Sequence, residues 1–110
     1  MYKIDIKPLS VNQAWQGKRF KAPAYKTYER DLLLLLPAIK LPEPPYQIEM
    51  EFGFSNVQSD WDNPIKPLQD ILQKKYSFND KDVFRAVVEK RKVSKGNDYL
   101  KFKISTYGEL

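Results

Sequence analysis

The chain has 110 residues, which is enough for one domain with a hydrophobic core and too few for two, so we expect a single domain over residues 1–110. It contains no cysteine and no histidine, which excludes disulfides, thiolate zinc sites and imidazole chemistry. Its formal net charge of +5 indicates a polyanionic partner, and its longest apolar run, Leu32 to Leu36, is far shorter than a membrane span.

The spacing of apolar residues predicts an α+β domain in the order βαβαββ, with two helices packed on a mixed sheet. Alternation of apolar and charged residues from Tyr2 onward predicts a first strand that ends at Pro8. A first helix is expected over 25–36, because Pro37 stops it. The later elements are expected as strand 46–54, helix 65–75, strand 83–93 and strand 99–105. The last two strands are expected to pair as a hairpin through the turn 95–98.

The first predicted helix carries more leucine than its core face needs. The residues expected to contact the core are Tyr25, Tyr28, Leu32, Leu35 and Leu36. Leu34 projects from the opposite side, with Leu33 beside it. Apolar residues outside a core face often mark a contact between subunits, so these two leucines are candidates for a dimer contact.

Carboxylates gather around residues 60–63, Asp-Trp-Asp-Asn, and are followed by Asp70 and Asp80. Side chains of an extended segment repeat every two residues, so Asp60 and Asp62 would share one side of the backbone if the tryptophan between them is extended. Oxygen ligands suit Mg²⁺ or Mn²⁺, and convergence of the four aspartates would make a metal site. Asp and Asn also favour turns and helix N-caps, so spacing alone leaves a structural turn or cap open.

Basic and aromatic residues mix between Leu9 and Ala24, a segment without a clean period. Such a mixture suits contact with a phosphate backbone and stacking on bases. The residues that this interpretation assigns to DNA are Asn12, Trp15, Lys18, Arg19 and Lys21. A surface loop with Trp15 and Phe20 folded onto the core is the alternative.

Taken together, these motifs resemble the RusA-type Holliday junction resolvases over most of the chain. The residues that carry the resemblance are Ser10, Val11, Asn12, Trp15, Asp60, Asp62, Asn63, Lys66, Asp70, Leu72, Asp80, Val83 and Lys90. The specific part is the block D-x-D-N-x-x-K-x-x-x-D-x-L, which runs here from Asp60 to Leu72. The family carries an acidic pair before a valine-rich strand, so Asn79 is a departure, while Asp80 keeps the second member of that pair.

The resemblance implies a homodimeric, Mg²⁺-dependent endonuclease, with Mn²⁺ able to substitute, that cuts four-way DNA junctions and other branched DNA by paired nicks. The catalytic residues would be Asp60, Asp62, Asp80 and Lys66, and the metal ligands would be Asp60, Asp62, Asp80 and Asp70. Lys66 would lie near the scissile phosphate, and Lys90 would join the basic segment at the DNA. The family is common in phages and prophages, so a cytoplasmic protein of a bacterial host is expected. A non-catalytic DNA-binding dimer of the same fold is the main alternative, and a basic RNA- or protein-binding module would leave the aspartates without a purpose.

Overall fold

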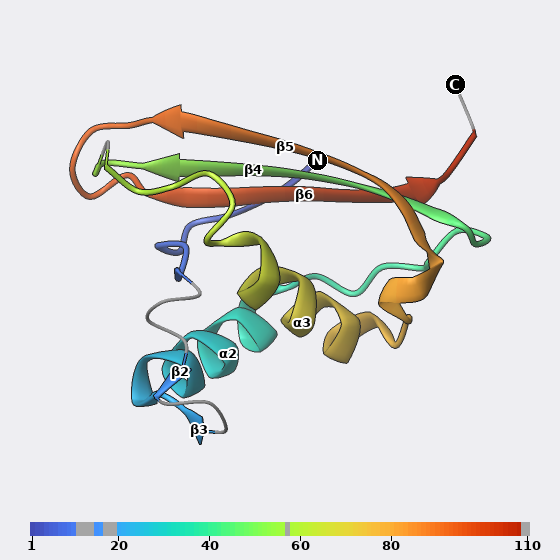
Figure 1. Ribbon diagram of the computed structural model, residues 1–110, viewed down its shortest axis with the longest axis horizontal. Helices are drawn as coiled ribbons and strands as arrows, with labels where there is room; N and C mark the ends of the chain where they lie inside the picture. Colours follow the sequence, from blue (N-terminus) through green and yellow to red (C-terminus); the bar gives the residue numbers. More distant parts are fainter. Residues whose placement is uncertain (11–14, 17–19, 57, 109–110) are drawn as a thin grey trace.

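In the computed structural model, the chain folds into a four-stranded mixed sheet with two helices on one face (Figure 1). The structure describes residues 1–10, 15–16, 20–56 and 58–108. The elements of this layer pair are β1 (Tyr2–Ile4), α2 (Pro23–Leu35), β4 (Tyr46–Phe54), α3 (Ile65–Tyr76), β5 (Val83–Lys92) and β6 (Tyr99–Thr106). The predicted α+β class and the order βαβαββ of the main elements are confirmed. The additional short elements are β2 (Trp15–Gln16), β3 (Phe20–Lys21) and the 3₁₀ turn η1 (Asp80–Asp82).

The strands lie in the order β1-β6-β4-β5, with β5 parallel to β4 and β6 antiparallel to both β1 and β4. Because β4 separates β5 from β6, the predicted hairpin between the last two strands is wrong. The connection 93–98 crosses the end of β4 instead. β5 and β6, on either side of β4, lie about 10 Å apart, twice the usual strand spacing, and a six-residue connection spans that distance easily. The turn residues at 95–98 suit both a hairpin and a connection across β4, so they could not show which of the two the chain forms.

β4 is central because both of its faces are covered. Its Ile48, Met50 and Phe52 side chains are buried beneath the helices. On the other face the ring of Tyr99 lies against Gly53, where an added Cβ would meet the ring at 2.2 Å. Only glycine fits there, and its absent side chain lets the aromatic ring close over the sheet.

Each helix buries one face against this sheet. α2 begins at Pro23, whose missing N–H is no loss in the first turn. Leu35, expected in the core, is 52% exposed, because it ends the helix beside residues 5–6, beyond the last residue of β1. Leu34 is exposed as expected, while Leu33 packs against the edge of the core. α3 buries Pro67, Leu68, Ile71 and Leu72. Among the described residues, no helix is both long and apolar enough to cross a membrane.

Candidate functional site

The acidic loop, which we define as residues 60–63, connects the end of β4 to the start of α3. It bends in its middle, so the expectation of an extended segment with Asp60 and Asp62 on one side is not met. The side-chain amide of Asn63 donates to Oδ2 of Asp60 at 3.1 Å. The backbone N–H of Ile65 donates to the carbonyl of Asp62 at 3.2 Å. These two bonds form the turn that leads into the helix.

The carboxylate of Asp62 takes no part in this turn. α3 has Pro64 at its N-cap, and no side chain caps the helix. Within the described part of the chain the Asp62 carboxylate has no hydrogen-bond or ion-pair partner, and the side chain is exposed. The N-cap interpretation therefore finds no support at Asp62, whereas Asp60 does stabilise a turn. Two negative charges remain beside the positive end of the α3 dipole.

A lysine on β5 holds the chain directly before the acidic loop. The ammonium group of Lys90 donates a short hydrogen bond to the backbone carbonyl of Ser59. Lys90 is only partly exposed, and the structure places this predicted DNA contact beneath the loop. Its observed contact positions the acidic loop on the sheet.

Lys66 and Asp70 pair with each other one turn apart on α3. Nζ of Lys66 lies 3.4 Å from Oδ1 of Asp70. The charge of Asp70 also acts on Tyr25 of α2. Burial raises the pKa of Tyr25 to about 12, and the negative charges of Glu29 and then Asp70 add to this effect. An exposed pair at this spacing contributes only about 0.3–0.5 kcal/mol. The fold therefore loses little if Lys66 turns away from Asp70 toward a ligand.

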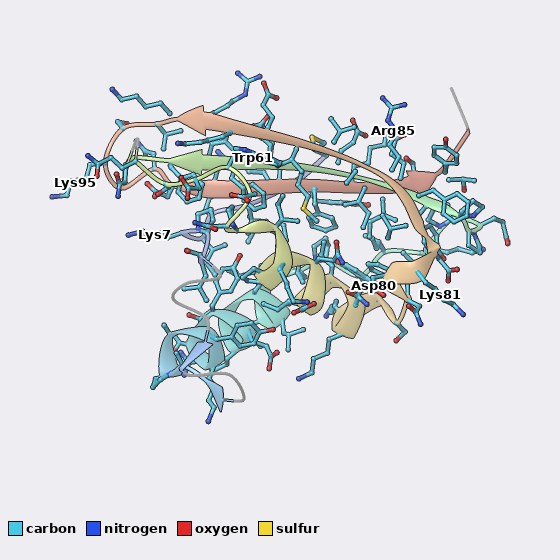
Figure 2. All side chains as sticks on the ribbon, in the orientation of Figure 1. Lys7, Trp61, Asp80, Lys81, Arg85 and Lys95 are labelled. Carbon is cyan, nitrogen blue, oxygen red and sulfur yellow. The ribbon has the colours of Figure 1, made fainter. Side chains whose placement is uncertain are left out.

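Asp80 lies at the opposite end of the sheet from the acidic loop. It opens η1 before the start of β5, which pairs with the start of β4, whereas the acidic loop follows the end of β4. Figure 2 shows Trp61 and Asp80 well apart, and the twelve residues of α3 between them span about 18 Å. No group of three or more acidic side chains in the described ranges could hold a metal ion. The expected convergence of Asp60, Asp62, Asp70 and Asp80 within one chain is therefore wrong, because α3 separates its two ends.

Asn79, the departure from the family pattern, has a structural use. Its side-chain oxygen accepts a hydrogen bond from the backbone N–H of Lys81 at 3.0 Å, so it caps η1. Asp80 next to it is exposed. The substitution thus leaves the neighbouring carboxylate accessible.

The predicted DNA contacts of the basic segment are only partly described. Asn12, Lys18 and Arg19 lie outside the described residues. The backbones of Trp15 and Lys21 stand opposite each other in the β2–β3 pair. The segment therefore precedes α2 as a small two-stranded unit (Figure 1).

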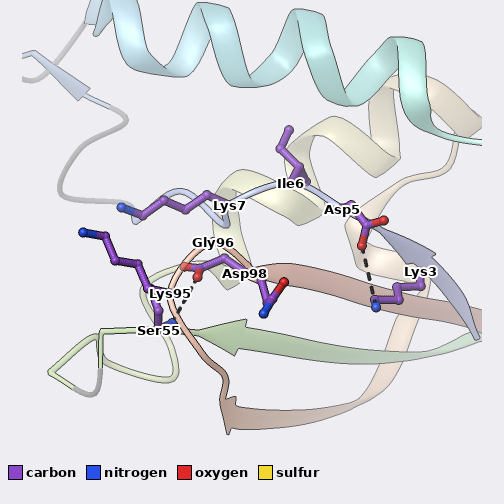
Figure 3. Close-up of a pocket in the computed structure, with 9 residues that line it drawn as sticks. Lys3, Asp5, Ile6, Lys7, Ser55, Lys95, Gly96 and Asp98 are labelled. Carbon is purple, nitrogen blue, oxygen red and sulfur yellow. Dashed lines mark hydrogen bonds and ion pairs between the residues drawn. The ribbon is translucent and has the colours of Figure 1, made fainter.

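Two cavities that share Lys7, one of them lined by the acidic loop, contain candidate residues that the sequence analysis did not identify. The first, of about 320 Å³, is lined by Asp60 and Asn63, with Lys7 in its wall. The second, which we call the lysine pocket, measures about 780 Å³ and is lined by Lys3, Lys7 and Lys95 (Figure 3). Lys7 belongs to both, so the cationic and acidic groups adjoin.

Two of these three lysines are available to a ligand. Lys3 is engaged, with its Nζ 3.7 Å from the carboxylate of Asp5. Lys7 and Lys95 are exposed and make no ion pair with other described residues, and their ammonium groups extend to the same side of the pocket in Figure 3. The turn that carries Lys95 is fixed by the carboxylate of Asp98, which accepts a backbone N–H just after β4 at 3.2 Å. No local pattern indicated this pair, because Lys7 and Lys95 lie near opposite ends of the chain.

A buried carboxylate, that of Glu51, lies on the sheet face away from the helices and is surrounded by donor groups. Glu51 is 8% exposed and accepts hydrogen bonds from the Tyr99 hydroxyl at 2.5 Å and from Nε of Arg91 at 3.2 Å. Nζ of Lys101 lies 3.5 Å from the same carboxylate. The Tyr99 bond and then these cations hold the pKa of Glu51 below its ordinary value, against the opposing effect of burial. The fold satisfies this charge completely.

No protein-family model matches the chain, and a search of curated proteins finds no match. The functional interpretation therefore depends on the motif and on the geometry of these residues.

Proposed function

We propose that this protein is a homodimeric, Mg²⁺-dependent endonuclease for branched DNA, of the RusA type, acting in a bacterial host as a phage or prophage product. The observation that carries the proposal is that charged side chains of opposite sign line one cavity at the acidic loop. Asp60 and Lys7 line the same cavity, and the lysine pocket adjoins it. A phosphodiester hydrolase needs cations for the phosphate and carboxylates for the metal in this relation.

Asp60 and Asp62 have the donor chemistry that Mg²⁺ requires. The Asp62 carboxylate has no protein partner in the described ranges, and the Asn63 bond engages only Oδ2 of Asp60. A bound Mg²⁺ would supply Lewis acidity toward the phosphate and a lowered pKa of water. The ligand set that the resemblance implies needs a further carboxylate, Asp80, which lies beyond the far end of α3 in the same chain.

A second copy of the chain is the natural source of the missing carboxylate. Asp80 is exposed at one end of the protomer, and the acidic loop is exposed at the other. In a two-fold dimer, Asp80 of the partner subunit would join Asp60 and Asp62 at each of two equivalent sites. Two such sites match paired nicks in a four-way junction.

The residues around the acidic loop supply contacts to DNA. Lys7 and Lys95 would hold a backbone phosphate beside Asp60, and Lys66 would turn from Asp70 toward the scissile phosphate. Trp61 is 58% exposed within the acidic loop, so its indole is available to stack on a base. The basic segment with Asn12, Trp15, Lys18, Arg19 and Lys21 would extend the contact along the backbone.

A non-catalytic DNA-binding dimer remains the second candidate, and one observation favours it. Asp80 lies too far from the acidic loop in one chain to share a metal ion with it, because Mg²⁺ holds its oxygen ligands at about 2.1 Å. If no second copy supplies this carboxylate, the protein would bind junctions without cutting them.

A synthetic four-way junction separates the two candidates. We expect paired nicks in Mg²⁺ or Mn²⁺ and none in Ca²⁺ or EDTA, with junction binding retained throughout. Asp80→Asn should abolish cleavage, whereas Asp82→Asn is the matched control in the same short turn and should cleave normally. Binding without cleavage in every metal would establish the non-catalytic candidate, and cleavage that persists in EDTA would contradict the metal mechanism.

A further inference from the structure

β5 is a long open edge of the sheet. Nine of its ten residues pair with β4 on one side, and no strand among the described residues pairs with the other side (Figure 1). Proteins usually protect such edges with short strands, prolines or bulges, because the unpaired N–H and C=O groups are a template for another strand. The opposite edge, β1, has only three residues. β5 contains neither proline nor glycine, and the one irregularity in its pairing with β4 lies at its start.

Apolar side chains on this edge are exposed. Phe84 is 64% exposed and Val87 is 39% exposed, and Ala86 between them is exposed as well. Exposed aromatic and β-branched residues along an unpaired strand indicate a surface that another chain covers.

We propose that β5 pairs antiparallel with β5 of a second copy of this chain, about a two-fold axis that passes through Val87 perpendicular to the sheet. Such an axis keeps the helices of both subunits on the same face and joins two four-stranded sheets into one. Residues opposite each other in an antiparallel pair point to the same face of the sheet. The two-fold axis must therefore pass through one residue of β5, and not between two residues.

The charges on β5 select Val87 as that centre. With the axis there, Arg85 stands opposite Glu89 of the partner subunit, and the same pair recurs on the other side of the axis. A centre one residue later would place Arg85 opposite Arg91 of the partner subunit twice, and like charges directly opposite destabilise a sheet. A centre one residue earlier would place Arg85 opposite a valine. Arg85 is exposed and makes no ion pair with another described residue of its own chain, so it is available for this contact.

The pairing has a consequence for the proposed endonuclease. Antiparallel strands bring the start of the partner's β5 beside the end of this β5, where Lys90 contacts the segment before the acidic loop. η1 of the second copy would then approach the acidic loop. Only this consequence depends on the proposed function, because the pairing itself does not require cleavage.

A single cysteine tests the register, because the chain has none of its own. In Val87→Cys the two copies of residue 87 would be about 5 Å apart between Cα atoms, within the range of a disulfide. In Arg85→Cys, on the same strand and face, they would be about 14 Å apart, too far to bridge. Because this control also removes the pair with Glu89, it is compared at a concentration at which sedimentation shows it to be dimeric. With a mild oxidant we expect Val87→Cys to run at twice the chain mass of 13.0 kDa on a non-reducing gel and Arg85→Cys to remain at the single mass.

Charge reversal tests the pairing without any covalent bond. Arg85→Glu and Glu89→Arg should each raise the dissociation constant of the dimer about tenfold or more, since each places like charges opposite each other twice. The double variant Arg85→Glu/Glu89→Arg restores opposite charges and should dimerise like the original chain. This recovery separates loss of pairing from loss of folding, because Glu89 also lies 3.1 Å from Arg91 in its own chain.

Three results would overturn the inference. The first is a protein that sediments as a monomer at all concentrations, which would leave the edge to a different chain. The second is equal crosslinking of Val87→Cys and Arg85→Cys. The third is a dimer that Leu34→Lys dissociates while the charge reversals do not, because that would place the interface at the exposed leucine of α2.

Discussion

Two carboxylate groups in this chain have opposite relations to the fold. Glu51 is enclosed, and its charge is neutralised by Tyr99, Arg91 and Lys101. Asp62 in the acidic loop is exposed, and its carboxylate has no partner in the described part of the chain. A carboxylate surrounded by donors stabilises the protein, whereas one without partners contributes little and is available to a ligand. The difference is consistent with a stabilising role for Glu51, and it leaves the acidic loop available for the proposed function.

The largest effect expected from this contrast is on cleavage. Asp62→Asn should reduce the cleavage rate by more than about 100-fold, because removing even an outer-shell partner of a metal ligand costs about 10- to 100-fold. Its melting temperature without metal should stay close to that of the original protein, since the fold uses no contact of this carboxylate. Paired cleavage and melting measurements check both statements. Normal cleavage by this variant would remove Asp62 from the site.

Glu51→Gln should have the converse profile. Loss of the charge leaves Arg91 and Lys101 without their counterion, and hydrogen bonds to charged groups are worth about 1.5–3 kcal/mol. We expect the free energy of unfolding to fall by about that amount, with junction cleavage per folded molecule unchanged. Urea unfolding followed by fluorescence provides the measurement. A variant as stable as the original would show that the enclosed cluster does not stabilise the sheet.

The contrast extends to the lysines. Replacing Lys7 and Lys95 together by alanine should weaken junction binding. The slope of log affinity against log salt concentration should become shallower by up to about 1.8, because each phosphate contact on duplex DNA contributes about 0.9 to that slope. Lys40 and Lys103 also share a cavity, of about 340 Å³, and are the matched control pair. Salt titrations of both double variants compare them directly. Equal changes in slope would mean that the lysine pocket has no special role.

The smallest effect concerns pH. Because folding lowers the pKa of Glu51, its stabilisation is present above the ordinary value of 4.5 and is lost as pH falls through the lowered value. Burial and then the hydrogen bond to Glu51 raise the pKa of Tyr99 to about 12. The stabilisation of the fold by the neutral Tyr99 hydroxyl is therefore present below pH 10 and is lost as pH rises toward 12. The stability difference between the original and Glu51→Gln should therefore shrink in acid. A difference that is constant down to pH 3 would contradict this assignment.

Local patterns predicted the elements of the fold but not all of their pairings. The alternation in β4 and the apolar face of α3 are properties of neighbouring residues, and both elements lie within a residue of their expected bounds. The position of β5 depends on long-range competition for β4, which a turn motif does not report. Similarly, the D-x-D-N spacing located the acidic loop, but it could not show that α3 separates that loop from Asp80. Lys7 and Lys95 meet only through the folded sheet.

The most direct test of the central claim, that the acidic loop and Asp80 act together across two subunits, is a subunit-mixing experiment. Asp62→Asn and Asp80→Asn should each be inactive on a four-way junction alone. After the two are mixed and allowed to exchange, nicking should return to about a quarter of the original rate, since half of the dimers are mixed and each has one intact site of two. If exchange is verified and the mixture stays inactive, the two aspartates do not form a shared site, and the account is contradicted.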